Sequence, residues 1–459
     1  MQKVKLVWLA SCLLCLGFAV TSCGNDEGGG SDYDPTKPIV CEQFYPEGGP
    51  ISTQVVLKGQ NFGSNKDEVR VFFNEKEAPV INVNDDHILV LAPRLPGENV
   101  KIKVKIGDQE GVFDKVFDYQ IQTNISTICG GDASAQTNPG AITNLSEAQF
   151  KASIDGGICV DRDLNIYFEI DAGDAKFFRY VANVESGKLV KIDELGIFLT
   201  RPWVCYDDVN DRVYHMQANL GNNEYWYYDR TNNFAYMGKG NVVYDDTKFL
   251  VDGMGIWGAR RAAAMNPADG KFYSRVLGGD FYCFDPVTAT GTRLTLVYNE
   301  MSGQPAGTAV DTKDGETFGM VFDKDTPNLL YYTNTSKNCI YKMDVTTGKY
   351  SILAGAASGG GGYLDGTLAQ AQFNNPRQMV KDSEGNLYVC DCNNHCIRKI
   401  NLKTGFVSTV AGLPGQPGYV NGTNEVAKFN KPAGLCIDKD DILYVGDGDN
   451  HAIRRVAIE

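Results

Sequence analysis

The sequence predicts an all-β protein made of a small immunoglobulin-like β-sandwich followed by a six-bladed β-propeller. Short runs of strand-forming residues alternate with turn residues over residues 37–121, a spacing typical of a β-sandwich. Beyond residue 122, one pattern recurs six times at intervals that suit four-stranded propeller blades. The chain has 459 residues, too many for one hydrophobic core, which agrees with at least two domains.

The six repeats share a small or aliphatic residue, then an acidic or amide residue two positions later, then a tyrosine. The first column is Cys159, Cys205, Ala264, Val321, Val380 and Cys436. The second column is Asp161, Asp207, Asn266, Asp323, Asp382 and Asp438. The tyrosines are Tyr167, Tyr214, Tyr273, Tyr331, Tyr388 and Tyr444. Because Asp and Asn side chains accept hydrogen bonds from nearby backbone N–H groups, we expect the second column to cap the turn after each innermost strand.

The two ends of the repeated region complement each other. The last repeat stops at Glu459 after its third strand, while residues 125–130 are similar to the fourth-strand segments 350–355 and 407–412. We therefore expect residues 125–130 to complete the last blade. Such a closure removes exposed strand edges.

The N-terminus has the pattern of an export signal. Two lysines, an apolar run and small residues precede Cys23, which predicts a signal peptide over residues 1–22 rather than a membrane span. The residues before Cys23 resemble the lipobox of bacterial lipoproteins, which implies that Cys23 carries a lipid and that residues 23–36 form a polar tether. An ordinary cleavage site near a chance cysteine is the alternative. Residues 25–27, Asn-Asp-Glu, resemble the acidic signal that sends Bacteroidetes lipoproteins to the outer face of the outer membrane.

Two family resemblances rest on particular motifs. Residues 46–63 (PEGGPISTQVVLKGQNFG) and residues 88–93 (ILVLAP) resemble the IPT/TIG family of immunoglobulin-like domains. That resemblance implies that residues 37–121 form a spacer domain without a site of its own. The pairs Asn394-His395 and Asn450-His451 lie in two similar repeats and resemble the Asn-His-Leu triplet of the NHL repeat. This second resemblance implies a propeller over residues 122–459.

The charge and the cysteines limit the possible functions. The formal net charge is -14, which argues against nucleic acid as a partner. Cys390, Cys392 and Cys396 lie close to a histidine, as in a metal cluster, but the sister repeat has glycine or alanine at all three positions. We therefore interpret these cysteines as small core residues, with a closed zinc site as the alternative.

Recurring polar groups in the last two repeats indicate scaffolding rather than catalysis. The two histidines, the pair Asp391 and Arg398, and the pair Asp447 and Arg454 occupy equivalent positions, whereas a catalytic set is usually unique. We expect no cofactor, and the many acidic residues leave an axial calcium site as an alternative.

Residues that differ between the repeats are the candidates for ligand binding. They lie at the beginnings of innermost strands or in the loops before them, where arginine can grip carboxylate or sulfate groups and aromatic rings can stack on sugars. Pairing of the arginines with nearby aspartates is the alternative. The predicted ligand-binding residues are Arg201, Trp203, Arg260, Arg261, Arg377, Tyr363 and Tyr419.

The whole chain resembles surface lipoproteins of Bacteroidetes that combine IPT/TIG and NHL regions and occur alongside polysaccharide-uptake machinery. The resemblance implies an outer-membrane accessory protein that binds an acidic or otherwise polar glycan, with outer-membrane transport proteins as further partners. The alternatives are a propeller lyase or hydrolase with an axial metal, and a protein–protein interaction scaffold. We expect binding rather than catalysis.

Overall fold

The computed structural model describes residues 33–94, 97, 99–135, 137–154, 156–173, 176–196, 203–216, 224–229, 235–241, 243–244, 262–275, 281–288, 290–294, 297–298, 317–355 and 360–459. The chain divides into two compact units, Met1–Gln120 and Ile121–Glu459. In the part of the chain that the structure describes, no helix is long and apolar enough to cross a membrane.

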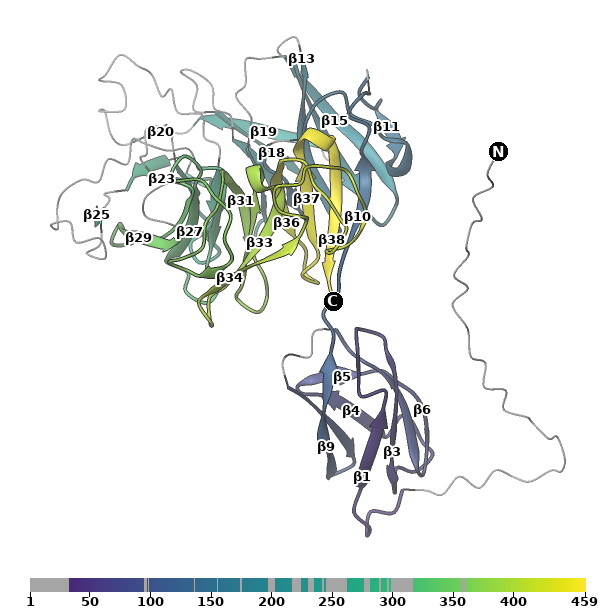
Figure 1. Ribbon diagram of the computed structural model, residues 1–459. Helices are drawn as coiled ribbons and strands as arrows, with labels where there is room; N and C mark the ends of the chain where they lie inside the picture. Colours follow the sequence, from purple (N-terminus) through teal and green to yellow (C-terminus); the bar gives the residue numbers. More distant parts are fainter. Residues whose placement is uncertain are drawn as a thin grey trace, which may run out of the picture. The chain divides into compact units, whose positions relative to one another are not determined.

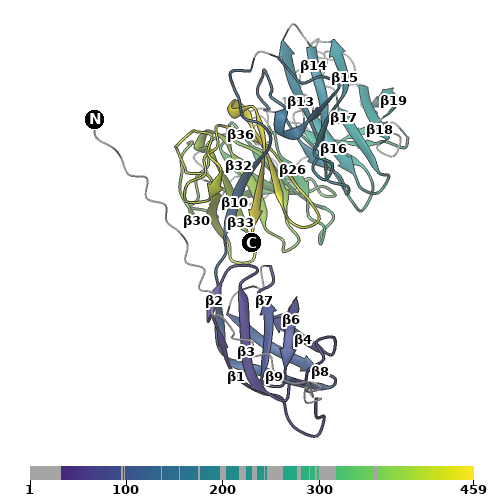
Figure 2. The ribbon, with the colours of Figure 1, turned by 90° about the vertical axis from the view of Figure 1, so that its right-hand side faces the viewer.

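The first unit is a β-sandwich of two sheets (Figure 2). One sheet has the order β1 (Val40–Tyr45), β3 (Gln54–Gln60), β7 (His87–Leu91) and β6 (Val80–Asn84). The other has the order β2 (Gly48–Gly49), β9 (Gln109–Tyr119), β8 (Val100–Ile106), β4 (Val69–Phe73) and β5 (Lys76–Ala78). In β8 the sequence VKIKVKI places Ile102 and Val104 in the core and its lysines on the outer face, because alternate side chains of a strand point to opposite sides.

The second unit consists of six sheets, and the innermost strands of neighbouring sheets contact each other around a closed ring (Figure 1). This arrangement confirms the predicted propeller. Blade one comprises β12 (Cys159–Val160), β13 (Asn165–Gly173), β14 (Lys176–Asn183), β15 (Lys188–Gly196) and β11 (Ile142–Asn144). Blade two comprises β16 (Trp203–Asp207), β17 (Arg212–Met216), β18 (Glu224–Asp229) and β19 (Ala235–Asn241). Blade three comprises β21 (Ala263–Met265), β22 (Phe272–Arg275), β23 (Phe281–Asp285), β24 (Thr290–Arg293) and β20 (Val243–Tyr244).

The other three blades have the same order from the innermost strand outward. Blade four comprises β26 (Met320–Phe322), β27 (Leu329–Asn334), β28 (Cys339–Asp344), β29 (Lys349–Ala354) and β25 (Val297–Tyr298). Blade five comprises β31 (Pro376–Lys381), β32 (Leu387–Asp391), β33 (Cys396–Asn401), β34 (Phe406–Ala411) and β30 (Gly366–Thr367). Blade six comprises β36 (Pro432–Ile437), β37 (Leu443–Asp447), β38 (Ala452–Ile458), β10 (Thr123–Gly130) and β35 (Gly422–Thr423). Short 3-10 turns, η1 (Leu145–Glu147), η5 (Cys392–Asn394) and η6 (Gly448–Asn450), occur between strands.

Blade six joins the two ends of the propeller, as the sequence predicts. β10 pairs antiparallel with the C-terminal strand β38, from Thr123 opposite Ile458 to Gly130 opposite Ala452. Both views show the blue β10 beside the yellow strands at the end of the chain (Figures 1 and 2). The ring is therefore closed by hydrogen bonds between distant parts of the sequence.

The recurring acidic or amide residues cap turns in all six blades, which confirms that prediction. In each blade the side-chain oxygen of this residue accepts a hydrogen bond from the backbone N–H two positions later, at 2.9 to 3.0 Å. Three of the recurring tyrosines donate their hydroxyl to the same carboxylate: Tyr167 to Asp161, Tyr331 to Asp323 and Tyr444 to Asp438. The recurring acidic or amide residues and tyrosines of the repeat therefore stabilise the fold.

Candidate ligand-binding face of the propeller

One face of the propeller collects the beginnings of the innermost strands. In blades two, five and six the first residue of the innermost strand lies opposite the last residue of the second strand: Trp203 opposite Met216, Pro376 opposite Asp391, and Pro432 opposite Asp447. We call this side, defined by Trp203, Pro376 and Pro432, the start face. Residues at or just after these positions are presented near the axis of the ring.

Of the four arginines predicted to bind a ligand, Arg377 belongs to the part of the chain that the structure describes, and it lies at the start face. It is half-buried, and its guanidinium carbon lies 4.8 Å from the ring centroid of Phe318, a residue of the neighbouring blade four. Its Nε also donates to Asn375 Oδ1 at 3.4 Å. The aromatic ring orients the guanidinium across the junction between two blades.

The other predicted residues near the axis fall mostly outside the described residues. Trp203 begins β16 at the start face, but only its backbone belongs to the described part. Arg201, Arg260 and Arg261 lie outside the described residues. Their grouping with Arg377 therefore stays a prediction.

Tyr363 and Tyr419 are held at the outer edges of their blades rather than beside Arg377. The Tyr363 hydroxyl lies 2.9 Å from Thr409 Oγ1 in β34, and the Tyr419 hydroxyl lies 2.7 Å from Thr127 Oγ1 in β10. These strands are the fourth from the axis, about three strand spacings or roughly 14 Å from the innermost strand. The structure does not bring these tyrosines together with Arg377, because the loops that carry them begin along the outer strands.

Each of these tyrosines covers a buried arginine. The Arg398 guanidinium carbon lies 4.9 Å from the ring centroid of Tyr363 and 5.0 Å from that of Phe373. In blade six, Arg454 lies between Tyr419 and Phe429 in the same way, at 4.8 and 5.2 Å. Tyr363 is still 42% exposed and Tyr419 40%, so part of each ring faces solvent.

The buried arginines pair with buried carboxylates. Arg398 Nη1 lies 2.8 Å from Asp391 Oδ2, and neither side chain is exposed to solvent. Asp391 also accepts hydrogen bonds from Asn394 Nδ2 at 2.9 Å and from the Asn374 N–H at 2.7 Å. Burial raises the pKa of Asp391 to about 6, while Arg398 and the hydrogen bonds from Asn394 and Asn374 act in the opposite direction. The recurring Asp and Arg residues are therefore structural here.

The two recurring histidines also connect blades. His395 Nδ1 accepts a hydrogen bond from the Lys431 N–H at 3.1 Å, which ties blade five to blade six. His451 Nδ1 lies 2.9 Å from the Phe150 carbonyl oxygen, so this nitrogen must donate, and it ties blade six to blade one. Burial and the nearby Lys431 lower the pKa of His395. Equivalent positions thus carry opposite hydrogen-bonding roles.

Cys390, Cys392 and Cys396 are buried in blade five. Burial raises the pKa of the Cys390 and Cys396 thiols well above the ordinary value. Cys390 Sγ lies 3.5 Å from the Gly434 carbonyl oxygen of the next blade. Among the described residues, no group of three or more His, Cys, Asp or Glu side chains is arranged to hold a metal ion.

Gln378 is a residue near the axis that sequence reasoning missed. Its Oε1 accepts hydrogen bonds from the N–H groups of Ile158 and Leu435, both at 2.9 Å, and its Nε2 donates to the Ile158 carbonyl at 2.8 Å. It therefore joins blades five, six and one. The repeat register contained a signal for Gln378, because the equivalent residues of two other blades are the glycines Gly434 and Gly319. A Cβ at Gly434 would lie 2.9 Å from the Gly156 carbonyl oxygen.

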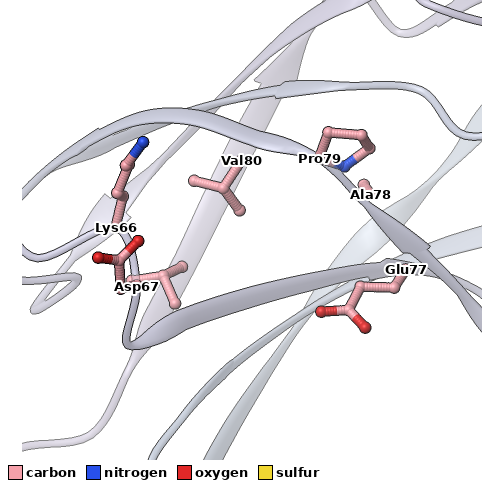
Figure 3. A pocket seen from close by; sticks show the side chains of 7 residues that line it. Lys66, Asp67, Glu77, Ala78, Pro79 and Val80 are labelled. Atoms are coloured by element: carbon pink, nitrogen blue, oxygen red, sulfur yellow. The ribbon is translucent and has the colours of Figure 1, made fainter.

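A hollow of about 380 Å³ lies in the first unit. Its lining residues are Lys66, Asp67, Val69, Glu77, Ala78, Pro79 and Val80 (Figure 3). Both carboxylate oxygens of Glu77 are held by Arg70, at 2.9 and 2.7 Å. Glu77 is therefore already paired with a cation.

Comparison with known families agrees with this architecture. Residues 39–119 match the IPT/TIG domain, and residues 373–400 and 429–455 match the NHL repeat. The protein thus combines an IPT/TIG β-sandwich with an NHL-type six-bladed propeller.

Individual proteins are similar to this chain in sequence or in fold. The protein SUPPRESSOR OF QUENCHING 1, chloroplastic, of Arabidopsis thaliana is 26% identical over 269 residues, which cover 56% of this chain and 19% of the relative, so the chain spans about a fifth of that protein. A solved protein of unknown function from Bacteroides thetaiotaomicron has a TM-score of 0.69 at 24% identity, over 94% of this chain and 100% of the other. An auxiliary nutrient binding protein from Bacteroides ovatus has a TM-score of 0.57 at 23% identity, over 94% and 100%.

Proposed function

We propose that this protein binds a glycan through the start face of its propeller and serves as an accessory to polysaccharide uptake. The observation that carries the proposal is the placement of Arg377, a half-buried cation that Phe318 of the next blade holds in one orientation at the start face. Trp203 begins an innermost strand at the same face from another blade. Two blades thus contribute an arginine and a tryptophan to one end of the ring.

These residue types suit a polar sugar. A guanidinium donates paired hydrogen bonds to a carboxylate or sulfate, and an indole ring stacks on the apolar face of a sugar ring. An arginine that is already oriented loses less side-chain entropy on binding. Arg201, Arg260 and Arg261 belong to the proposed set because the repeat register assigns them to the same strand beginnings.

Tyr363 and Tyr419 have a separate role in the proposed glycan binding. Both rings are partly exposed, and both are fixed by a hydroxyl contact to threonine and by a buried arginine beneath the ring. Rigid exposed rings at the outer edges of blades five and six are suited to contact the more distant sugars of a longer chain. We assign them a secondary role.

Support also comes from the solved relatives. A structure that covers nearly the full length of this chain is described as an auxiliary nutrient binding protein. The lipobox-like residues before Cys23 support an outer-membrane lipoprotein whose tether, residues 23–36, holds the protein at the cell surface.

A glycan array probed with residues 24–459 tests the proposal. We expect binding to a set of related acidic or polar glycans, followed by a measurable Kd in titration calorimetry. An array without binding, together with co-purification of a transporter from membranes, would instead support a protein–protein scaffold.

A further inference from the structure

Blade six carries an ion pair at two positions where blade five carries amides. In the loop before the innermost strand, Lys431 of blade six corresponds to Asn375 of blade five. In the turn after the second strand, Asp449 corresponds to Asn393. Lys431 Nζ lies 2.7 Å from Asp449 Oδ2. Residues that differ between similar repeats are candidates for ligand binding, because the scaffold needs what the repeats share.

The backbone at Lys431 favours a different residue type. Lys431 has a φ of 51°, and the equivalent Asn375 has a φ of 59°. This left-handed region suits asparagine, whose short polar side chain tolerates it, and is less favourable for lysine. A residue that breaks a local rule of this kind indicates a function. The charge of Lys431, rather than its backbone preference, therefore accounts for its presence in this loop.

Lys431 lies at the start face on the strand next to that of Arg377. It directly precedes Pro432, the first residue of β36. Arg377 directly follows Pro376, the first residue of β31. The two innermost strands β31 and β36 contact each other. The Lys431 backbone N–H donates to His395 Nδ1 of blade five at 3.1 Å, which fixes the loop of blade six against its neighbour.

Positive charge exceeds negative charge around Arg377 and Lys431. Burial raises the pKa of the Cys392 thiol to about 11, and both of these cations act in the opposite direction, so both lie close to Cys392. Asp449 and Asp391 act against the cations, but the Asp391 side chain is fully buried in an ion pair of its own. Among the described groups with the largest effect on Cys392, two cations thus face one exposed carboxylate.

The ion pair with Asp449 leaves Lys431 available to a ligand. The Lys431 side chain is 51% exposed and the Asp449 side chain is 41% exposed. An exposed pair of this kind contributes little to stability, because water screens the two charges. An anion that contacts Arg377 at the same time can therefore displace Asp449 from Lys431.

We propose that the start face selects glycans with an anionic substituent, a carboxylate or a sulfate, and that Arg377 and Lys431 bind this one group together. The inference rests on the glycan binding of the proposed function and specifies its class of ligand. The guanidinium donates paired hydrogen bonds to two oxygens of the anion, and the Lys431 ammonium donates to one oxygen as it leaves Asp449. Asp449 repels the same anion and lowers the affinity.

Paired acidic and neutral glycans test this inference on residues 24–459. The probes are oligogalacturonate and alginate beside their carboxyl-reduced forms, and dextran sulfate beside dextran. We expect at least one acidic probe to bind, and its neutral counterpart to bind at least about tenfold more weakly, because charge-assisted hydrogen bonds are lost. Loss on carboxyl reduction identifies a carboxylate, and binding of dextran sulfate without dextran identifies a sulfate.

Two variants that copy blade five separate ligand binding from a purely structural ion pair. Lys431→Asn should weaken binding of the acidic probe about tenfold, because one charge-assisted contact is lost. Asp449→Asn should strengthen that binding about threefold, because Lys431 is released and a repelling carboxylate is removed. An ion pair that only stabilises the fold predicts weaker binding in both variants.

The matched control is Lys439→Asn, in the turn at the other end of the innermost strand of blade six. It changes the net charge as Lys431→Asn does and should leave binding unchanged. Losses in both Lys431→Asn and Asp449→Asn, or unchanged affinity in both, would overturn the inference. Binding of neutral glycans alone, weakened by Trp203→Ala, would overturn it and leave the proposed function intact. An absence of any glycan binding would contradict the proposed function as well.

Discussion

Arg454 Nη1 lies 2.7 Å from Asp447 Oδ2, and both side chains are completely buried in blade six. Arg454 also donates to the carbonyl oxygens of Lys428 and Val420 and to Asn421 Oδ1. A buried charge is tolerated only when it is paired and hydrogen-bonded, so this network explains why the loops before β36 adopt one fixed path.

Replacement of Asp447 by alanine should destabilise the propeller strongly. The change leaves the Arg454 cation buried without its carboxylate, which costs about 3 to 5 kcal/mol. Urea unfolding of Asp447→Ala measures this loss. The control is Asp449→Ala, which removes the exposed partner of Lys431 and should cost less than about 1 kcal/mol. Equal effects of the two changes would contradict a structural role for the buried pair.

Closure of the ring should depend on β10. Deletion of residues 123–130 exposes the edge of β38 and part of the core, so the whole propeller should melt at a lower temperature. Ile125→Ala is the milder test, since this buried side chain should contribute about 2 to 4 kcal/mol. Asn124→Ala, on the exposed side of the same strand, is the control. An unchanged melting temperature after the deletion would rule out this closure.

Cys390, Cys392 and Cys396 should be replaceable as a group. The change Cys390→Gly/Cys392→Gly/Cys396→Ala copies the residues of blade six and should leave a folded propeller. Metal analysis should find no stoichiometric zinc in either protein. Zinc in the wild type that disappears in the triple variant would show that the cysteines form a metal site.

The repeat register predicted the features that depend on local chemistry and repetition. The turn-capping Asp and Asn residues and the shared last blade arise from patterns that recur along the chain. Tyr363 could not be placed in the same way, because the path of its loop depends on contacts with Thr409 and Arg398 that are distant in sequence. Gln378 was missed because its partners Ile158 and Leu435 lie in other blades.

Cys23 should carry the lipid. Radiolabelled fatty acid should enter the wild-type protein during growth and should not enter Cys23→Ala, because the thiol is the proposed attachment point. Labelling of both proteins to the same extent would exclude Cys23 as the site.

Binding of an array-identified glycan to the variants Arg377→Ala and Trp203→Ala tests whether the start face binds the glycan. Each change should weaken binding by about 1 to 3 kcal/mol, since one removes a charge-assisted hydrogen bond and the other a stacking surface. The arginine contribution should decrease as salt rises, because exposed charges are screened over about 8 Å at physiological ionic strength, while the tryptophan contribution should persist. Lys439→Ala, an exposed change in the turn after the innermost strand of blade six, should have no effect. Both variants should bind the glycan more weakly with unchanged melting temperatures, and wild-type affinity in the Arg377→Ala/Trp203→Ala double variant would contradict glycan binding at the start face.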